Sequence, residues 1–247
     1  MEDMVQYKGD LADKYSSQDR LAHPQNMVPY STWLEELGDI QSLEILDLAC
    51  GSGYGSRMLA ERGARVTGVD IAPEMIAKAQ EIEALDALGI TYIVSDAKKL
   101  DLHKTFDIVA PSFLFNYAKD KQELIELIAT AAIHLNTGGR MVALNAPPNP
   151  IILRLPNANS STEWLGEPNK EGSLVRMHFY DLKGDWLCDI DFNYWSKETY
   201  EECFNLAGFT NIEWVPMRMT EEGKRLLPNW QDIEKNICSI VVKGIKA

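Results

Sequence analysis

The residues best suited to chemistry lie in one short stretch, Ile45–Gly55, which reads ILDLACGSGYG. Its first half belongs to an apolar run that is typical of a buried strand, and a helical pattern follows it. Between the two, Gly51 and Gly53 allow a tight turn and let a ligand approach bare backbone. The start of the following helix offers free N–H groups. The stretch therefore predicts a ligand-binding loop.

An acidic residue stands at the end of the next predicted strand. Asp70 follows Gly51 by nineteen residues. A carboxylate in this position can accept hydrogen bonds from both hydroxyls of a ribose. We therefore expect the first strand–helix–strand unit to bind a ligand that contains adenosine.

Two residues bear on which adenosine ligand is bound. A dinucleotide-binding loop has its third glycine where this chain has Ser56. Asp47 precedes the glycines by four residues, and its negative charge would repel a pyrophosphate. The same charge favours a cationic, zwitterionic ligand such as S-adenosylmethionine (SAM).

Predicted strands and helices alternate up to residue 145. The helix that Pro73 opens has Met75, Ala79, Ile82 and Leu85 on one face. The expected strands are 43–49, 65–69, 90–94, 106–110 and 140–144, and the expected helices are 27–38, 54–61, 73–85 and 123–135. This order predicts an α/β fold with a doubly wound parallel sheet, which binds its ligand at the carboxyl ends of the strands.

After residue 145 the pattern changes. Prolines end the regular structure, and residues 160–172 are polar. The two segments 174–180 and 186–194 predict a β-hairpin. In the second arm one face is expected to be buried; it comprises Trp186, Cys188, Ile190, Phe192 and Tyr194. A helix over 196–206 and late strands at 211–215 and 236–242 complete the chain.

The composition narrows the class of protein. The 247 residues carry a net charge of −13, with 45% hydrophobic and 25% charged residues, as in a folded globular chain. The absence of a Lys/Arg cluster argues against nucleic acid as a partner. There is no apolar run of about 20 residues and no apolar N-terminal signal, so we expect a cytoplasmic protein with no membrane partner. Four widely spaced cysteines predict reduced thiols and no metal site.

Five motifs in order resemble class I SAM-dependent methyltransferases over residues 44–145. They are the glycine-rich Asp47–Gly53, the second-strand motif Val66–Ile71, the adenine-reading Ser95–Ala97, the fourth strand Phe106–Val109 and the turn Leu135–Gly139. The resemblance implies a Rossmann-like methyltransferase fold with a seven-stranded, mostly parallel sheet, an inserted β-hairpin and an N-terminal helical lid. It implies a single domain over 1–247, divided into a lid (1–42), a SAM-binding half (43–145), a substrate-shaping insertion (146–195) and the C-terminal half of the sheet (196–247).

Shorter segments resemble the toxoflavin-type methyltransferases, which methylate a small nitrogen heterocycle. These are Phe115–Ala118, Tyr194–Ser196, Ala207–Phe209 and Glu213–Trp214. The expected function is therefore methyl transfer from SAM to a nitrogen or oxygen of a small, heteroaromatic metabolite by a monomer or homodimer. The alternatives are a SAM-binding enzyme of the same fold that does not methylate, such as a cyclase, and an NAD-type oxidoreductase.

The family's roles carry over to particular residues. Asp70 should bind the ribose, Ile71 should pack on the adenine, and Asp96 should accept from the adenine amino group, although Asp96 could instead cap a turn. The expected cofactor-binding residues are Asp47, Ala49, Gly51, Gly53, Asp70, Ile71, Met75, Asp96, Ala97, Pro111 and Tyr15.

The sequence gives fewer indications of the substrate-binding residues than of the cofactor-binding ones. Aromatic and amide side chains that could contact a flat acceptor are Phe113, Phe115, Asn116, Tyr117, Trp164 and Trp195. No catalytic base is identified, and the candidates are His178, Tyr180 and Tyr194, for which packing in the hairpin is the alternative. Tyr7 and Tyr15 lie in the N-terminal segment, which forms either a lid or a frayed end.

Overall fold

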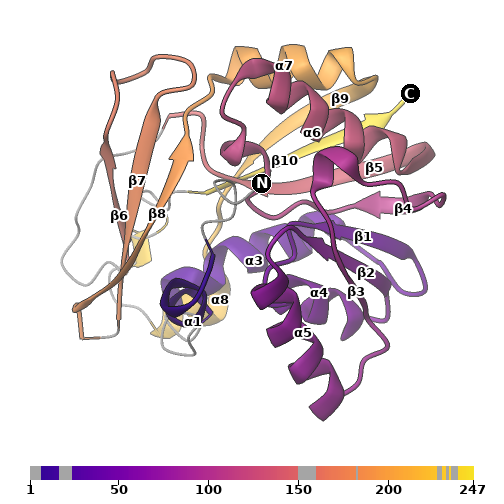
Figure 1. The fold of residues 1–247 in the computed structure, drawn as a ribbon, viewed down its shortest axis with the longest axis horizontal. Helices are drawn as coiled ribbons and strands as arrows, with labels where there is room; N and C mark the ends of the chain where they lie inside the picture. The colour runs from indigo at the N-terminus through magenta and orange to yellow at the C-terminus, as the bar shows by residue number, and fades with distance from the viewer. Residues whose placement is uncertain are drawn as a thin grey trace.

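The structure, a computed structural model, describes residues 7–16, 24–149, 160–181, 183–226, 230–231, 234 and 239–247. A seven-stranded sheet with strand order β3-β2-β1-β4-β5-β10-β9 forms its centre (Figure 1). The strands are β1 (Glu44–Leu48), β2 (Arg65–Asp70), β3 (Thr91–Val94), β4 (Phe106–Val109), β5 (Leu135–Asn145), β9 (Phe209–Pro216) and β10 (Ile240–Lys246). All neighbours pair in parallel except β10, which runs antiparallel to β5 and β9. The predicted doubly wound, mostly parallel sheet is confirmed.

Helices cover both faces of this sheet. The helices α3 (Pro24–Leu37), α4 (Tyr54–Ala60) and α5 (Pro73–Leu85) lie on one face, and α6 (Lys121–Ile133) and α7 (Lys197–Leu206) lie on the other (Figure 1). Because both faces are covered, the central strand β1 is largely buried, and Ile45, Leu46 and Leu48 have no exposed surface. The strand order reverses between β1 and β4, so the loops after these two strands diverge and leave room for a ligand.

Local capping explains where the helices begin. Asp120 accepts a hydrogen bond from the Glu123 N–H of α6 at 2.9 Å, and Ser196 accepts one from the Thr199 N–H of α7 at 3.2 Å. Pro73 occupies the first turn of α5, as the sequence predicts. The predicted apolar face of α5 is wrong in its second half, where Ile82 and Leu85 are 39% and 90% exposed. The last turns of α5 extend away from the sheet (Figure 1), and Glu83 there pairs with Arg57 of α4 at 3.3 Å.

A second, antiparallel sheet stands beside the first. Its strands β6 (Ser160–Trp164), β7 (Leu174–Tyr180) and β8 (Trp186–Asn193) pair in the order β6-β7-β8. The β7–β8 hairpin confirms the prediction, whereas β6 lies in a stretch whose polar composition gave no strand signal. The buried face of β8 is also confirmed, except that Trp186, which stands beside the turn of the hairpin, is 56% exposed.

Short helices lie near both ends of the chain, next to segments outside the described residues. At the N-terminus, α1 (Asp10–Tyr15) and α3 flank a segment outside the described residues. Near the C-terminus, α8 (Glu221–Leu226) follows β9, and the predicted strand over 236–242 is observed as β10 over 240–246, with residues 236–238 outside the described part. Within the described residues, no helix has the length and apolar character needed to cross a membrane.

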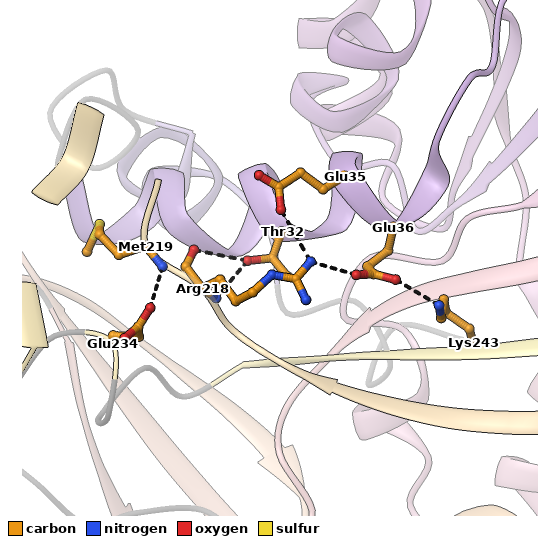
Figure 2. Close-up of polar contacts among 7 residues, drawn as sticks. All are labelled: Thr32, Glu35, Glu36, Arg218, Met219, Glu234 and Lys243. Carbon is orange, nitrogen blue, oxygen red and sulfur yellow. Dashed lines mark hydrogen bonds and ion pairs between the residues drawn. The ribbon is translucent and has the colours of Figure 1, made fainter. Parts of the chain in front are cut away.

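A polar cluster ties α3 to the C-terminal half of the sheet (Figure 2). Glu36 accepts hydrogen bonds from Arg218 at 2.6 Å and from Lys243 of β10 at 2.7 Å. The Thr32 hydroxyl accepts from the Arg218 N–H at 3.0 Å and donates to the Arg218 carbonyl at 3.2 Å. The Glu36 side chain is only 15% exposed, so these bonds are partly shielded from water. They hold the pKa of Glu36 below its ordinary value, through the bond from Lys243 first and that from Arg218 second.

The variant Glu36→Gln should therefore destabilise the protein at pH 7 by about 1–2 kcal/mol, because two charge-assisted hydrogen bonds lose their anionic acceptor. Since the pKa of Glu36 is lowered in the folded state, this stabilisation is lost as the pH falls below about 4.5, the ordinary value. Urea unfolding at pH 7 and at lower pH measures both effects. The matched control is Glu35→Gln, whose side chain is 57% exposed and makes one contact to Arg218 at 3.2 Å. Equal losses in the two variants would contradict the role assigned to Glu36.

Candidate active site

The glycine-rich loop follows β1 in a tightly turned conformation. Ala49, Gly51 and Gly53 all have positive φ, at 64°, 56° and 83°. The turn is closed by hydrogen bonds from Cys50 N–H to the Val69 carbonyl and from Gly53 N–H to the Cys50 carbonyl, each 3.0 Å. Ala49 adopts this left-handed conformation without being a glycine, which costs about 1–2 kcal/mol and marks a strained point beside the cavity described below.

Gly53 is required by its surroundings as well as by its φ. A Cβ at this position would lie 2.4 Å from the hydroxyl of Tyr92, a side chain of β3 beneath the loop. Gly55, two residues on, has no such conflict, because its nearest atoms are 3.6 Å from an added Cβ. The loop therefore rests directly on Tyr92, whose hydroxyl is buried and has no hydrogen-bond partner in the described residues.

Asp47 is fully buried below the start of α4. Its Oδ2 accepts a hydrogen bond from the Ser56 hydroxyl at 2.6 Å, and within the described residues its Oδ1 has no partner. Burial raises the pKa of Asp47 to about 7; the Ser56 bond opposes that rise and the charge of Asp70 adds to it. Ser56, which occupies the place of the third dinucleotide glycine, thus serves as the partner of Asp47.

Asp70 joins the end of β2 to the glycine-rich loop. Its Oδ2 accepts from the Gly51 N–H at 2.9 Å and its Oδ1 from the Ala72 N–H at 2.8 Å. Burial raises the pKa of Asp70, while the backbone hydrogen bonds from Ala72 and Gly51 oppose that rise. The carboxylate therefore fixes the loop while lying at the wall of a cavity.

A cavity of about 150 Å³ opens at the carboxyl ends of the first strands. It is lined by Tyr7, Ala49, Val69, Asp70, Ile71, Ser95, Asp96, Ala97, Lys98, Leu114, Tyr117, Lys119, Glu123 and Leu127. The structure thus brings together five predicted cofactor residues, namely Ala49, Asp70, Ile71, Asp96 and Ala97. One polar end and a largely apolar remainder suit a nucleoside.

Asp96 caps a turn, which is one of the two alternatives that the sequence leaves open. Its Oδ1 caps the short helix Ala97–Lys99 by accepting from the Lys98 N–H at 3.0 Å. A carboxylate has a second oxygen, and Asp96 also lines the cavity. Nearby, Lys98 forms an ion pair with Glu123 of α6, which closes this end of the cavity.

The other predicted cofactor residues lie around the cavity rather than in its wall. Met75 is buried behind Gly51, where its terminal carbon is 3.3 Å from the place of a Gly51 Cβ. Pro111 is held by a hydrogen bond from Leu144 N–H to its carbonyl at 2.9 Å. Tyr15 packs edge-on against Tyr7, with 4.6 Å between the ring centroids.

The predicted substrate residues separate into groups. Tyr117 lines the cavity, and Trp164 packs on Tyr194 in the second sheet, with ring centroids 5.3 Å apart. Three others are buried elsewhere. Phe115 packs on Phe204 in the main core, and Trp195 donates its indole N–H to the Ala118 carbonyl at 3.1 Å. Asn116, which follows Phe115 in the chain, has a buried amide oxygen that no described residue binds. Phe113 has a φ of 54° after β4 and packs partly against the core on the other face.

The catalytic candidates do not line this cavity. His178 pairs with Asp189 at 2.8 Å and with Glu163 at 3.3 Å, so it links β6, β7 and β8. Tyr180 pairs with the Ser161 hydroxyl at 3.2 Å, and Tyr194 is 6% exposed in an apolar cluster. These contacts favour the packing alternative for the three residues. Among the described residues, no group of three or more His, Cys, Asp or Glu side chains is arranged to hold a metal ion.

Several residues of the site carry no signal in the sequence. Lys98, Lys119, Glu123 and Leu127 enter the cavity wall only because α6 and the loop after β3 come together. Tyr92 has the apolar pattern of an ordinary strand residue. No local motif could identify such residues, since their role depends on contacts between distant segments.

The variant Gly53→Ala should be destabilised by at least about 2 kcal/mol, because an alanine there meets both an unfavourable φ and the Tyr92 hydroxyl. The matched control is Gly55→Ala, which has ordinary contacts within α4 and should be as stable as the wild type or more so. Chemical denaturation of both variants tests this difference. Equal stability of the two would show that the loop is not held against Tyr92.

The variant Asp47→Asn should gain stability relative to the wild type as the pH rises. Between the ordinary value of 3.8 and about 7, the folded state holds a proton on Asp47 that the unfolded state has lost. Wild-type stability therefore falls across this window, by as much as about 1.4 kcal/mol per pH unit, and the asparagine variant lacks this titration. Thermal unfolding of both proteins without ligand, from pH 5 to pH 8, measures the difference. A difference that does not change with pH would refute the raised pKa.

Comparison with known proteins agrees with this geometry. Residues 45–139 match the family described as "Methyltransferase domain". A demethylmenaquinone methyltransferase from Thermus thermophilus is 40% identical over 110 residues, which are 43% of this chain and 48% of that protein. A ubiquinone biosynthesis O-methyltransferase from Pseudomonas fluorescens is 28% identical over 204 residues, 77% of this chain and 84% of that protein. The chain thus spans about half of the first of these relatives.

A solved structure shows the same fold. The S-adenosylmethionine-dependent methyltransferase from Mesorhizobium loti superposes with a TM-score of 0.65 over 89% of this chain and 98% of that one, at 23% sequence identity. A structural likeness at 23% sequence identity shows the fold alone, and the family match covers residues 45–139. Together they show that residues 45–139 are similar to methyltransferase domains and that the chain has the fold of the class I SAM-dependent methyltransferases.

Proposed function

We propose that the protein binds SAM in the cavity and transfers its methyl group to a nitrogen or oxygen of a small molecule, for which a heteroaromatic ring is the acceptor class that we favour. The observation that carries this proposal is the meeting of Ala49, Asp70, Ile71, Asp96 and Ala97 in one cavity wall. The sequence predicts all five as cofactor-binding residues, and they come from three separate loops.

The residues present fit the cofactor. Asp70 has lone pairs left after its two backbone bonds and can accept from ribose hydroxyls. Asp96 offers a hydrogen-bond acceptor and Ala97 a backbone N–H to the edge of an adenine ring. The apolar side chains of Ile71 and Leu114 line the same cavity and can contact the ring. Asp47 has a buried oxygen that no described residue binds, which suits a cationic group or its bound water near the glycine-rich loop.

When bound, SAM supplies a methyl group already activated by its positive sulfur. The chain then has mainly to align the acceptor and to exclude water, and orientation of this kind can supply up to ~7–11 kcal/mol. A basic ring nitrogen needs no proton removed before it attacks, whereas a hydroxyl attacks faster when a base removes its proton. The packing of His178, Tyr180 and Tyr194 in polar pairs and apolar contacts therefore favours an acceptor that is itself nucleophilic.

The acceptor would approach from the side of the second sheet and the N-terminal segment. Aromatic edges of Tyr7, Tyr15, Tyr117 and Phe179 meet there, and they suit a flat ring. The relatives named above are quinone-pathway methyltransferases by their names, which supports a cyclic acceptor without specifying its chemistry. The toxoflavin-type likeness and a monomeric or dimeric state remain parts of this proposal.

The variant Asp70→Asn should bind S-adenosylhomocysteine (SAH) at least about tenfold more weakly, because the anionic acceptor for the ribose is lost while the side-chain shape is kept. Isothermal titration calorimetry measures the affinity, and the melting temperature shows whether the loop is intact. The control is Asp101→Asn, an aspartate whose side chain is 68% exposed and which does not line the cavity. Unchanged affinity in Asp70→Asn would refute this assignment.

The reaction itself is tested by incubating the protein and SAM with a panel of small heterocycles, phenols and amines. Mass spectrometry should detect SAH together with a product heavier by one methyl substitution. SAM consumption without methyl gain would indicate a non-methylating enzyme of the same fold. Binding of NAD in preference to SAM would indicate an oxidoreductase and overturn the proposal.

A further inference from the structure

The N-terminal segment contacts two separate parts of the molecule at once. On one side Ala12 is buried against Ala72 and Met75, the Gly9 N–H donates to Glu74, and Lys78 pairs with Asp13. Each of these contacts joins residues 9–13 to the start of α5, next to the loop that carries Asp70. The segment is therefore attached to the cofactor half of the molecule.

On its other side the segment contacts the second sheet. Leu11 and Tyr15 pack in an apolar cluster with Phe179 of β7 and with Cys188 and Ile190 of β8. The Lys14 ammonium lies 5.2 Å from the ring centroid of Trp186. Residues 7–16 thus bridge the cofactor half and the second sheet, as the position of α1 between them shows (Figure 1).

One hydrogen bond places this bridge over the cavity. The Tyr7 hydroxyl bonds to the Tyr117 hydroxyl, and both residues line the cavity. The Tyr7 ring is flanked by Tyr15 and Tyr117 at centroid distances of 4.6 and 6.3 Å. Burial, followed by the charges of the neighbouring tyrosines, raises the pKa of Tyr7, so its hydroxyl keeps the proton that this bond needs.

Tyr117 offers a fixed point of attachment. It ends the short helix Phe115–Tyr117 after β4, where Phe115 is fully buried against Phe204 of α7. The next residue, Ala118, accepts the Trp195 indole N–H at 3.1 Å. Since the core holds Tyr117 from both sides, the N-terminal segment is the partner that can move when the hydroxyl pair breaks.

We propose that Tyr117 is a positioning residue, which acts through its hydroxyl on Tyr7 to hold residues 7–16 across the cofactor cavity and so controls how fast a bound nucleoside leaves. This inference rests on the proposed function for the identity of the nucleoside. It assigns to one hydrogen bond the position of residues 7–16 over the cavity.

The test uses Tyr117→Phe, which removes the hydroxyl and keeps the ring. Stopped-flow measurement should show SAH leaving about three- to tenfold faster than from the wild type, because one partly buried hydrogen bond across the cavity is lost. Tyr7→Phe should have the same effect, and the double variant should be no faster than either single one, since both changes break the same bond. The matched control is Tyr200→Phe, a fully buried tyrosine beside Asn145 that does not line the cavity, which should leave the SAH rate unchanged.

A second measurement does not depend on any ligand. Trypsin cleavage after Lys14 in the free protein should be faster in Tyr117→Phe than in the wild type and unchanged in Tyr200→Phe. Equal cleavage and equal SAH release in Tyr117→Phe and the wild type would overturn the inference and leave the proposed function standing. A wild type that fails to bind SAH would refute the proposed function, while faster cleavage in Tyr117→Phe would still support the attachment of residues 7–16 through Tyr117.

Discussion

The bond network of the Asp70 carboxylate is the interaction on which the site depends. One oxygen holds the glycine-rich loop through Gly51 and the other holds the start of α5 through Ala72. Two loops from adjacent parallel strands are thereby set at a defined separation, and the cavity lies between them and the loop after β3. Since charge-assisted bonds to backbone N–H groups are strong and directional, a single side chain can order the whole nucleoside-binding edge.

The loop above Asp70 is arranged at a cost in stability. Asp47 is buried with one oxygen unpaired, Tyr92 has a buried hydroxyl without a partner in the described residues, and Ala49 has a positive φ. Each of these features destabilises the ligand-free protein. Their concentration around one loop is expected of a site that is completed by a ligand, because a cationic or hydrogen-bonding group can offset the cost when it binds.

The remaining parts of the molecule close the site from outside. The cluster of Glu36, Arg218 and Lys243 ties α3 to the C-terminal half of the sheet, behind the glycine-rich loop. On the opposite side, aromatic and apolar contacts join α1 to the three-stranded sheet. The two sides of the molecule are thus held by contacts of different kinds.

The sequence by itself indicated the alternation of strands and helices, because periodicity, glycine turns and strand-end acids are local signals that hold within a few residues. It pointed to Asp70 through its position at a strand end, and to Ala49, Ile71, Asp96 and Ala97 through motifs that resemble those of class I SAM-dependent methyltransferases. Only the tertiary structure decided that Ser56 partners Asp47, that Tyr92 supports Gly53, that Tyr7 meets Tyr117 and that polar Ser160–Trp164 is a strand. Those outcomes depend on which distant segments pack together, and packing is a property of the whole chain that no short stretch of sequence records.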